Sequence, residues 1–572
     1  MGLVSELRRR NGFRMAVLYA VAAWLIMQVT EVVKDLANLP DWIGPTTLGL
    51  LAIGFPIALI FSWFYELTPE GISPEKDVDP EASITHVTGR RLDFVLISLL
   101  CAAVILFAYD KWWIGPAPER SIAVLPFENM SDDPGNEYFS DGISEDILNL
   151  LAGIPELRVT SRSSAFSFKG QNLDVPTMAA KLNVAHVLEG SVRKSGNQLR
   201  IVAQLIEVKS DTHLWSDTYD RELEGVFAIQ DEIAAAVVSA LKITLLGREV
   251  KAAETNPEAY ALYLQARYFL NQFTEEGHTR AETLLKQALE IDPGFAPGWY
   301  LLGIVYKRQA AGFGPLSFYE GYELARQTIN KALDVDPQYG PAYAALAALE
   351  MEHGWDFVAA RQHLQQALAL NPGDADILMK AAALNRILGR LDEAIDLYQQ
   401  AVTLDPVSNL GHMNLGISYY TADRLDEAAD SAQMLLSLNP GGFIGHFLLG
   451  IVLLEQGNAP AALAEMEQET LGAFRLQGTA IVQHELGNAG ASDAALKELI
   501  ECCGGGDPPS ADYQIAQVYA DRGESDLAFE WLEVAYDNRD GALAGMMNSK
   551  GFTNLHDDPR WEPFLDKMGF PR

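Results

Sequence analysis

The sequence is 572 residues long and carries 42 Lys plus Arg against 77 Asp plus Glu, which gives a formal net charge of -35 at pH 7. A single hydrophobic core stops growing at roughly 250 to 300 residues, so we expect several domains. The negative charge predicts no nucleic-acid partner, because it would repel a phosphate backbone. Three cysteines, Cys101, Cys502 and Cys503, are too few for a four-cysteine zinc site or a framework of several disulfides.

Three largely uncharged apolar segments occupy the first 115 positions, at about 15–33, 46–65 and 94–114. Each has about the 20 residues that a helix needs to cross a hydrocarbon core roughly 30 Å thick. Asp110 and Lys111 lie at the end of the third segment beside Trp112 and Trp113, as expected where a span meets the membrane interface. We therefore expect residues 1–115 to form a membrane anchor of three transmembrane helices.

The placement of arginines gives this anchor a direction. Four arginines precede the first span, and Arg90 and Arg91 precede the third, whereas Lys34 is nearly alone between the first and the second. The positive-inside rule then places the N-terminus and the loop 66–91 in the cytoplasm. For a bacterial chain this predicts an inner-membrane protein whose residues after about 115 are periplasmic. A cleavable signal peptide is disfavoured, because the end of the first span has no small-x-small cleavage site.

Residues 120–250 alternate between strand and helix patterns. The run Ser121–Phe127 (SIAVLPF) is apolar and β-branched, which predicts a buried strand. Gly196 lies in a predicted hairpin turn. Further strands are expected at Leu157–Thr160, Ala185–Arg193, Gln198–Val208 and Thr212–Tyr219, and helices at Glu137–Leu151, Val175–Leu182 and Val226–Leu246. The pattern predicts a compact α+β domain.

The same stretch resembles a known family. The run SIAVLPFENMSDDPGNEYFSDGISEDILNLLAGIPELRVTSRSSAFSFKG, continued by LNVAHVLEGSVRKSGNQLRIVAQLIEVKSDTHLWSDTYDRE, is similar to the TolB-like (FlgO-like) domain of bacterial envelope proteins. In that family the domain commonly precedes tetratricopeptide repeats and can follow a class III adenylate cyclase domain. The N-terminal RRRNGFRMAVLYAVAAWLIMQV resembles a membrane module of the same architecture. The resemblance therefore implies a membrane-anchored TolB-like protein with repeats, related in architecture to the outer half of some class III adenylate cyclases.

A repeat with a period of 34 residues begins at about residue 256. Acid–proline or asparagine–proline steps recur at intervals of 44, 35, 34 and 34 residues, at Pro293, Pro337, Pro372, Pro406 and Pro440. This period is typical of tetratricopeptide repeats, helix pairs that bury a core only by stacking. We expect about eight helix pairs over 256–540, an insertion around Ala310–Phe318 and a C-terminal capping segment over 541–572. The predicted fold class is multidomain: a three-helix transmembrane anchor, an α+β domain and an all-α superhelix.

The sequence shows no pattern that carries catalysis. Its ten histidines are scattered, and it has no His-Glu-x-x-His pair, no phosphate-binding glycine loop and no nucleophile elbow. Asp141, Glu145 and Asp146 could present carboxylates to a metal, but acids in the first turns of a helix more often serve its dipole. Ser167 and Lys169 share a face without an oxyanion-hole motif. We predict no enzyme activity, no catalytic residue, no cofactor and no metal.

The redox state of Cys502 and Cys503 stays open. Two free thiols in a loop before three glycines are the favoured interpretation, and a vicinal disulfide is the alternative in an oxidising compartment.

The concave side of the repeat superhelix is the predicted binding site. In repeats of this kind the first helix of each pair lines the concavity, and a surface of aromatic, methionine and isolated cationic side chains suits an extended or helical peptide. The alternative is that some of these side chains belong to the core between repeats. The predicted groove residues are Tyr300, Ile304, Lys307, Met379, Arg386, Met413, Ile417, Tyr420, Phe447 and Ile451.

These patterns lead to a functional hypothesis. We expect a periplasmic scaffold, anchored in the inner membrane, that binds an envelope protein or peptide through its repeats and its TolB-like domain in envelope assembly or sensing. The first alternative is a receptor or accessory subunit that passes a periplasmic signal through the transmembrane helices to a cyclase-like or regulator-like partner. An extracytoplasmic enzyme is a remote alternative. Homo-oligomerisation through the membrane helices is also open.

The predicted topology can be tested with reporter fusions. A reporter enzyme that is active only outside the cytoplasm should work when fused after Leu246 or at Arg572, and it should fail when fused at Ser83, because the arginines before the first and third spans favour the cytoplasm. The opposite pattern of activity would overturn the predicted compartment.

Overall fold

The computed structural model divides the chain into two compact units, Met1–Pro116 and Ala117–Arg572. The residues it describes are 119–154, 157–171, 173–241, 255–313, 315–439, 444–505 and 511–570, with two short strands and four single positions nearer the N-terminus. The three predicted membrane spans lie outside the described residues, apart from those single positions and Tyr65. Among the described helices, none is both long and apolar enough to cross a membrane. The anchor therefore stays a prediction.

A short hairpin is the described part of the first unit. Strand β1 (Tyr65–Thr68) pairs antiparallel with β2 (Gly71–Pro74), with Tyr65 opposite Pro74. This hairpin lies at the start of the loop that was expected in the cytoplasm, and the sequence pattern did not predict it.

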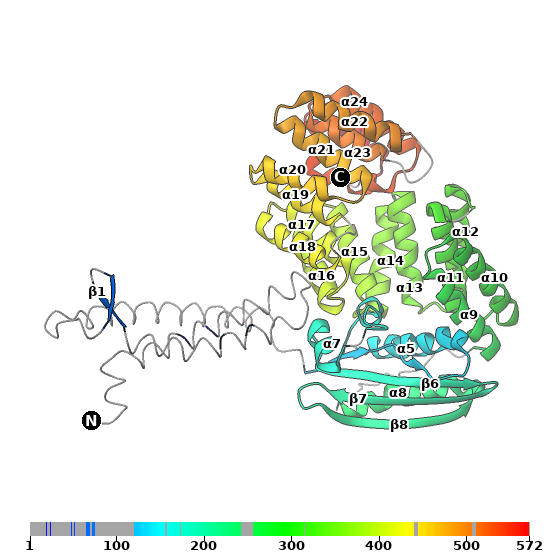
Figure 1. Ribbon diagram of the computed structural model, residues 1–572. Coiled ribbons are helices and arrows are strands. Elements are labelled where there is room, and N and C mark those ends of the chain that lie inside the picture. The colour runs from blue at the N-terminus through cyan, green and yellow to red at the C-terminus, as the bar shows by residue number, and fades with distance from the viewer. Residues whose placement is uncertain are drawn as a thin grey trace. The chain divides into compact units, whose positions relative to one another are not determined.

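The second unit begins with a six-stranded mixed sheet in the order β5-β3-β6-β7-β8, with β4 paired to β6 (Figure 1). Strand β3 runs parallel to both β5 and β6, whereas β6, β7 and β8 form an antiparallel meander. The turn between β6 and β7 contains Gly196 with a positive φ of 59°, as the predicted hairpin requires. The strands are β3 (Ser121–Val124), β4 (Glu128–Asn129), β5 (Arg158–Val159), β6 (His186–Ser195), β7 (Gln198–Glu207) and β8 (Thr212–Glu222).

Helices cover the two faces of this sheet. Because side chains alternate along a strand, Ile122 of β3 points to one core and Ala123 to the other. The first core also contains Ile143 and Ile233, and the second contains Leu182. The helices are α5 (Glu137–Ala152), α6 (Arg162–Phe166), α7 (Val175–Leu182) and α8 (Val226–Ala240). Helix α7 has the predicted bounds, and the five-residue helix α6 was not predicted.

Eight helix pairs follow within the described part of the chain (Figure 1). They are α9 (Pro257–Leu270) and α10 (Glu275–Ile291), α11 (Ala296–Arg308) and α12 (Phe318–Val335), α13 (Gly340–Leu349) and α14 (Phe357–Leu370), α15 (Ala375–Ile387) and α16 (Leu391–Leu404), α17 (Asn409–Thr421) and α18 (Leu425–Leu438), α19 (Gly445–Glu455) and α20 (Ala459–Gln468), α21 (Gly472–Glu485) and α22 (Ala489–Cys503), and α23 (Asp512–Asp521) and α24 (Ser525–Asp537). The longer 44-residue interval contains a turn of π-helix at Gln309–Phe313, where the insertion was expected.

Small residues let the helices of each pair approach closely. Ala394 and Ala428 are fully buried where their helices pack. A Cβ atom at Gly416 would lie 2.6 Å from Leu448 Cδ2 and 3.0 Å from Ser431 Cβ, so no larger side chain fits there without rearrangement. The repeat pattern read from the sequence therefore reflects a packing constraint.

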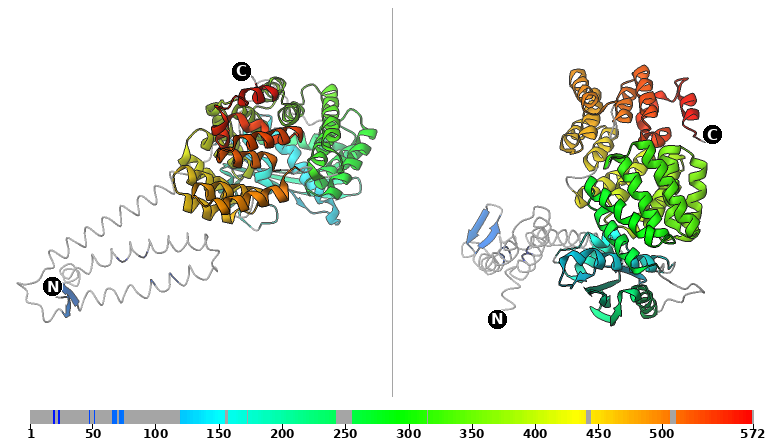
Figure 2. Two further views of the ribbon diagram at one scale, coloured as in Figure 1. Left: turned by 90° about the horizontal axis from the view of Figure 1, so that it is seen from above. Right: turned by 90° about the vertical axis from the view of Figure 1, so that its right-hand side faces the viewer.

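The end of the chain packs back onto the middle repeats (Figure 2). It comprises two stretches of 3-10 helix, Gly541–Asn548 and Lys550–Leu555, and the helix α25 (Trp561–Lys567). The ring of Phe570 stacks on Phe357 of α14 at a centroid distance of 4.9 Å. One buried apolar cluster joins side chains of α13, α14 and α15 to those of α23, α24 and the C-terminal segment. The superhelix is thus closed against itself.

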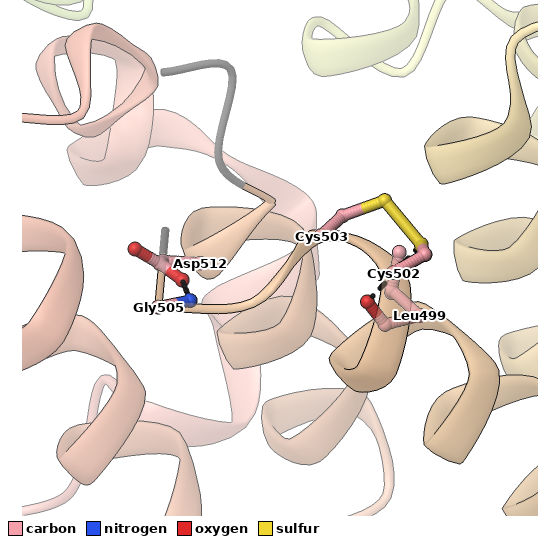
Figure 3. Close-up of a disulfide and its surroundings, with 5 residues drawn as sticks. All are labelled: Leu499, Cys502, Cys503, Gly505 and Asp512. Atoms are coloured by element: carbon pink, nitrogen blue, oxygen red, sulfur yellow. Dashed lines mark hydrogen bonds between the residues drawn. A yellow bond between two sulfur atoms is a disulfide. The ribbon is translucent and has the colours of Figure 1, made fainter. Parts of the chain in front are cut away.

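The adjacent cysteines lie at the end of α22 and not in a loop. Cys502 and Cys503 are joined by a disulfide (Figure 3). Cys502 Sγ lies 3.4 Å from the carbonyl oxygen of Leu499, and beside the disulfide Gly505 N donates a hydrogen bond to Asp512 Oδ1 at 2.7 Å. The structure therefore has the vicinal disulfide, the alternative to two free thiols.

The sheet should not tolerate a side chain at Gly190. A Cβ atom there would press against the carbonyl oxygen of Val202 and lie 2.9 Å from Phe127 Cε2. Because backbone cannot move aside cheaply, Gly190→Ala should lower the free energy of unfolding of this domain by about 1 to 3 kcal/mol. Denaturant unfolding measures the change. Gly472→Ala is the matched control, because a Cβ atom there meets nothing within 4 Å. Equal stability of the two variants would contradict the predicted packing.

Candidate binding site

A buried ion cluster joins the mixed domain to the first repeat. Arg267 of α9 is 7% exposed and ion-pairs with two carboxylates of α5, Glu145 and Asp146; its Nη1 lies 2.9 Å from Asp146 Oδ1. Arg162, the first residue of α6, also pairs with Glu145, its Nε lying 2.5 Å from Glu145 Oε2. Two arginines thus balance two carboxylates at this interface.

Hydrogen bonds extend the cluster to a third helix. The hydroxyl of the fully buried Tyr260 donates to Asp146 Oδ2, and Gln230 Nε2 of α8 donates to Tyr260 Oη at 2.8 Å. Gly142 allows the approach, because a Cβ atom there would lie 2.7 Å from Leu264 Cδ1. Helices α5, α8 and α9 are therefore held together by both polar and close apolar contacts.

The cluster changes the acidity of its carboxyl groups in opposite directions. Burial disfavours the charged form of Glu145, but Arg267 and Arg162 together hold its pKa below the ordinary range. Burial raises the pKa of Asp146, because Arg267 and the Tyr260 hydrogen bond offset the lost hydration only in part. The pKa of Arg267 rises well above its ordinary value, since its two carboxylates outweigh burial.

A second contact holds the mixed domain to the middle of the superhelix. Asp405, which follows α16 and is 3% exposed, accepts hydrogen bonds from Ser163 Oγ at 2.7 Å and from Ser164 Oγ. Ser161 N donates to the carbonyl oxygen of Leu404 at 3.1 Å. The mixed domain therefore contacts the repeats at α9 and again at the end of α16.

A cavity of about 500 Å³ lies beside the ion cluster, and Glu145, Asp146 and Arg267 are among the residues that line it. Its walls come from α5 and α8 of the mixed domain and from α9, α11, α13 and α15 of the repeats. Aromatic rings make up much of the surface: Tyr263 meets Phe295 edge-on at 5.0 Å, and Tyr300 meets Tyr339 at 5.5 Å. Burial, outweighing the opposing effect of Arg267, raises the pKa of Tyr263 to about 12, so its hydroxyl stays protonated.

Three predicted groove residues line this region. Tyr300 and Ile304 line the cavity and, together with Lys307, also line a second cavity of about 280 Å³. Lys307 Nζ pairs with Glu352 Oε2 at 2.7 Å. These three predicted residues of α11 therefore line cavities, and partner binding by them stays a prediction.

Two other predicted residues contact the protein's own C-terminal segment. Asn548 Nδ2 donates to the carbonyl oxygens of Arg386 and Ile387 at 3.0 and 2.9 Å. Lys550 lies over the ring of Tyr420, with Nζ 4.7 Å from the centroid, and pairs with Asp423. The C-terminal segment therefore contacts α15 and α17 at residues that the sequence predicted for partner binding.

The remaining predicted residues pack between helices. Phe447 is 8% exposed and meets Phe474 edge-on at 5.2 Å. Met413, Ile417 and Ile451 pack around the same cluster, and Met379 packs against the neighbouring one. Binding by these residues stays a prediction.

The acids and the Ser–Lys pair considered for chemistry have structural partners. Lys169 Nζ lies 2.6 Å from both Glu137 Oε1 and Asp141 Oδ1. Ser167 Oγ donates to the carbonyl oxygen of Ser164 at 2.8 Å. These contacts, like those of Arg267, explain the acids of α5 as ion-pair partners.

Several residues that shape the cavity were not predicted from the sequence. Tyr260, Tyr263 and Arg267 follow one another at helical spacing on a single face of α9, which is a signal for a shared polar surface. Their partners on α5 lie more than 100 positions away, so periodicity could not identify them. Arg308 and Asp374 were missed because each looks like an ordinary helix-end residue.

The comparisons with known proteins agree with the repeat architecture. The family described as "Tetratricopeptide repeat" matches residues 356–409 and 413–475. This chain therefore contains tetratricopeptide repeats beside its small mixed sheet.

Two named relatives are similar to parts of the chain. A protein of Rhizobium meliloti (strain 1021) named "Putative adenylate cyclase 3" is 43% identical over 189 residues, which cover 32% of this chain and 32% of that protein. The transcriptional regulator HilA of Salmonella typhimurium is 22% identical over 311 residues, 53% of this chain and 55% of HilA. The chain thus spans about a third of the first relative and about half of the second.

Two solved structures with similar repeats each cover less than half of the chain. PilF of Pseudomonas aeruginosa has a TM-score of 0.31 and 19% identity, covering 37% of this chain and 92% of PilF. PilW, described as a widely conserved type IV pilus biogenesis factor, has a TM-score of 0.33 and 14% identity, covering 42% of this chain and 100% of PilW.

The ion cluster should be essential for the joint, the contact between α5 of the mixed domain and α9 of the first repeat. Arg267→Met would leave Glu145 and Asp146 with Arg162 alone, and an uncompensated buried charge should lower the free energy of unfolding by about 3 to 5 kcal/mol. Chemical denaturation measures the loss. Arg280→Met is the control, because Arg280 is exposed and its ion pair should contribute less than about 0.5 kcal/mol.

The same variant should depend on pH in a defined direction. Loss of Arg267 removes a positive charge that lowers the pKa of both carboxyl groups, so each pKa is higher in the variant than in the native chain, and acidification stabilises the variant relative to the native chain. The native chain meanwhile loses the stability that comes from the lowered pKa of Glu145. The difference between variant and native should therefore be largest near neutral pH and shrink as the pH falls below about 5. A difference that grows with acidification would contradict the assignment.

Proposed function

We propose that this protein is a membrane-anchored scaffold whose repeats bind a protein or peptide partner in the periplasm. Tetratricopeptide repeats form extended concave surfaces that suit such partners, and this chain contains them. The long apolar segments before residue 115 and the arginines that flank them support the anchor and its orientation.

One observation carries the location of partner binding. The inner face of α11 lines two open cavities through Tyr300 and Ile304, whereas the inner faces around Arg386 and Tyr420 contact the C-terminal segment. A partner therefore finds accessible surface at the end of the superhelix nearest the mixed domain. We assign binding to α11 and its neighbours rather than to the whole length of the groove.

A signalling role is the second candidate, and a specific observation favours it. The relative from Rhizobium meliloti, named for an adenylate cyclase, shares 43% identity over 189 residues. In this second proposal the partner bound by the repeats is a signal that reaches a cytoplasmic enzyme through the membrane helices. Cyclic-nucleotide levels that do not respond to deletion of the gene, under conditions in which the partner is present, would exclude it.

Site-directed photocrosslinking tests the scaffold proposal. A photoreactive amino acid at Tyr300 should crosslink a discrete partner in cells of the native host, whereas the same group at Tyr319 should not, because Tyr319 is 67% exposed and lines neither cavity. Introducing Ile304→Glu should abolish the crosslinked band, since a charge in the apolar wall opposes binding. An unchanged helical circular dichroism signal controls for folding. A band that survives Ile304→Glu, or that is equal at Tyr319, would contradict the assignment.

A further inference from the structure

The cavity at the junction holds polar groups that the fold leaves without partners. Among the described residues, no hydrogen bond is made by the hydroxyl of Tyr300 or by that of Tyr339, although both line the cavity. Burial and the carboxylates of Asp376 and Asp374 raise the pKa of Tyr300 well above its ordinary value, so this hydroxyl is a permanent donor. Tyr300 is half-buried, so a ligand oxygen that accepts from this hydroxyl takes the place of water at the cavity wall.

A guanidinium without a carboxylate partner adds to these donors. Arg308 Nη1 donates to the carbonyl oxygen of Leu270 at 2.9 Å, and the guanidinium lies over the ring of Phe273 at 4.7 Å. In the described part of the chain no carboxylate lies within ion-pair distance of Arg308. Its remaining N–H groups can therefore bind an anion at the wall that also holds Tyr300.

Carboxylates stand on another wall of the same cavity. Asp374 uses Oδ1 to accept from Asp376 N at 2.9 Å and from Ile377 N at 3.1 Å, which caps α15 and leaves Oδ2 free in the hydrogen bonds described. Asp376 pairs with Lys380 at its exposed edge. The cavity thus presents a cation and an acidic pair to one ligand.

The rest of the lining carries no surplus charge. Glu145, Asp146, Arg162 and Arg267 balance one another within the ion cluster. A ligand with a single charge would satisfy either Arg308 or the acidic pair and would leave the other group unmatched. A molecule that carries both a carboxylate and an ammonium satisfies both.

We propose that the junction cavity binds a small zwitterion of the amino-acid or short-peptide class, with its carboxylate at Arg308 and Tyr300 and its ammonium at Asp374. The volume of about 500 Å³ falls within the range of roughly 300 to 1,000 Å³ typical of small-molecule sites. The rings of Tyr263, Phe295 and Tyr339 provide apolar contact for a side chain. This site goes beyond the proposed scaffold function and does not require a protein partner.

A ligand in this cavity should stabilise the contact between the mixed domain and the repeats. Because the cavity is walled by α5 and α8 on one side and by α9, α11, α13 and α15 on the other, a ligand that fills it contacts both parts of the second unit. Binding should therefore raise the melting temperature of the chain by mass action.

Calorimetry with four small probes tests the proposal on the purified full-length chain. The probes are the dipeptide Ala-Phe, free phenylalanine, N-acetyl-Ala-Phe and the amide of Ala-Phe. The dipeptide or the free amino acid should give saturable heat, and each blocked dipeptide should bind at least about tenfold more weakly than Ala-Phe, since each lacks one charge-assisted contact. Saturation by Ala-Phe alone assigns the site to peptides. Where phenylalanine saturates the site, it is assigned to amino acids, and the amide and N-acetyl forms of phenylalanine then serve as its blocked probes.

Three variants in the cavity and one control outside it assign the contacts. Arg308→Met should remove the preference for a free carboxylate, and Arg308→Lys should restore part of it. Asp374→Asn should remove the preference for a free ammonium while still capping α15, because asparagine caps helices as well as aspartate. Arg326→Met, at an exposed ion pair outside the cavity, should change nothing. Melting temperatures report on folding, and Asp374→Asn remains decisive if Arg308→Met is unstable.

Two calorimetric results would contradict the proposed zwitterion site. Blocked probes that bind as tightly as their free forms, or the absence of saturable heat with both Ala-Phe and phenylalanine, overturn the proposal. Because the probes are small and the chain is purified, such a result leaves the crosslinking test of a protein partner unaffected.

Discussion

The buried pairing of Arg267 with Glu145 and Asp146 is the interaction on which the rest of the second unit depends. A repeat array contacts only its neighbours, so its first helix needs something to cover its outer face. Here α5 and α8 of the mixed domain cover this face. A buried charge is costly alone, but Arg267 and its two carboxylates compensate one another's loss of hydration. The cavity beside the cluster exists because the same joint holds α5 next to α9, α11 and α13.

The superhelix is closed at several places, and this restricts where it can bind. The contact of Ser163 and Ser164 with Asp405 attaches the mixed domain to the middle repeats, and Asn548 attaches the C-terminal segment to the end of α15. An array open along its whole length would offer a continuous groove. This one leaves the surface near Tyr300 free and fills the surface near Tyr420 with its own Lys550. Tyr300 lines two cavities, and both the proposed partner and the proposed ligand are assigned to this region.

Local sequence patterns predicted most helices and strands, but they could not predict contacts between residues that are far apart in the sequence. Helix Val175–Leu182 has its predicted bounds, and the 34-residue period led to stacked helix pairs, because both signals arise from neighbours in the sequence. The five-residue helix α6 is too short to show a period. Arg267 and Asn548 act on residues more than 100 positions away, so a pattern within one window cannot show their partners. The membrane anchor and the cellular compartment stay predictions from sequence.

Hydrogen exchange of the native chain and of Arg267→Met, compared peptide by peptide, tests the central claim that one ion cluster joins the two parts of the second unit. In the variant, we expect hydrogen-exchange protection to fall together in α5 and α9, on both sides of the joint, while α23 and α24 keep theirs. Loss of protection confined to α9, with α5 unchanged, would show that the mixed domain and the repeats are stable independently and would contradict the account.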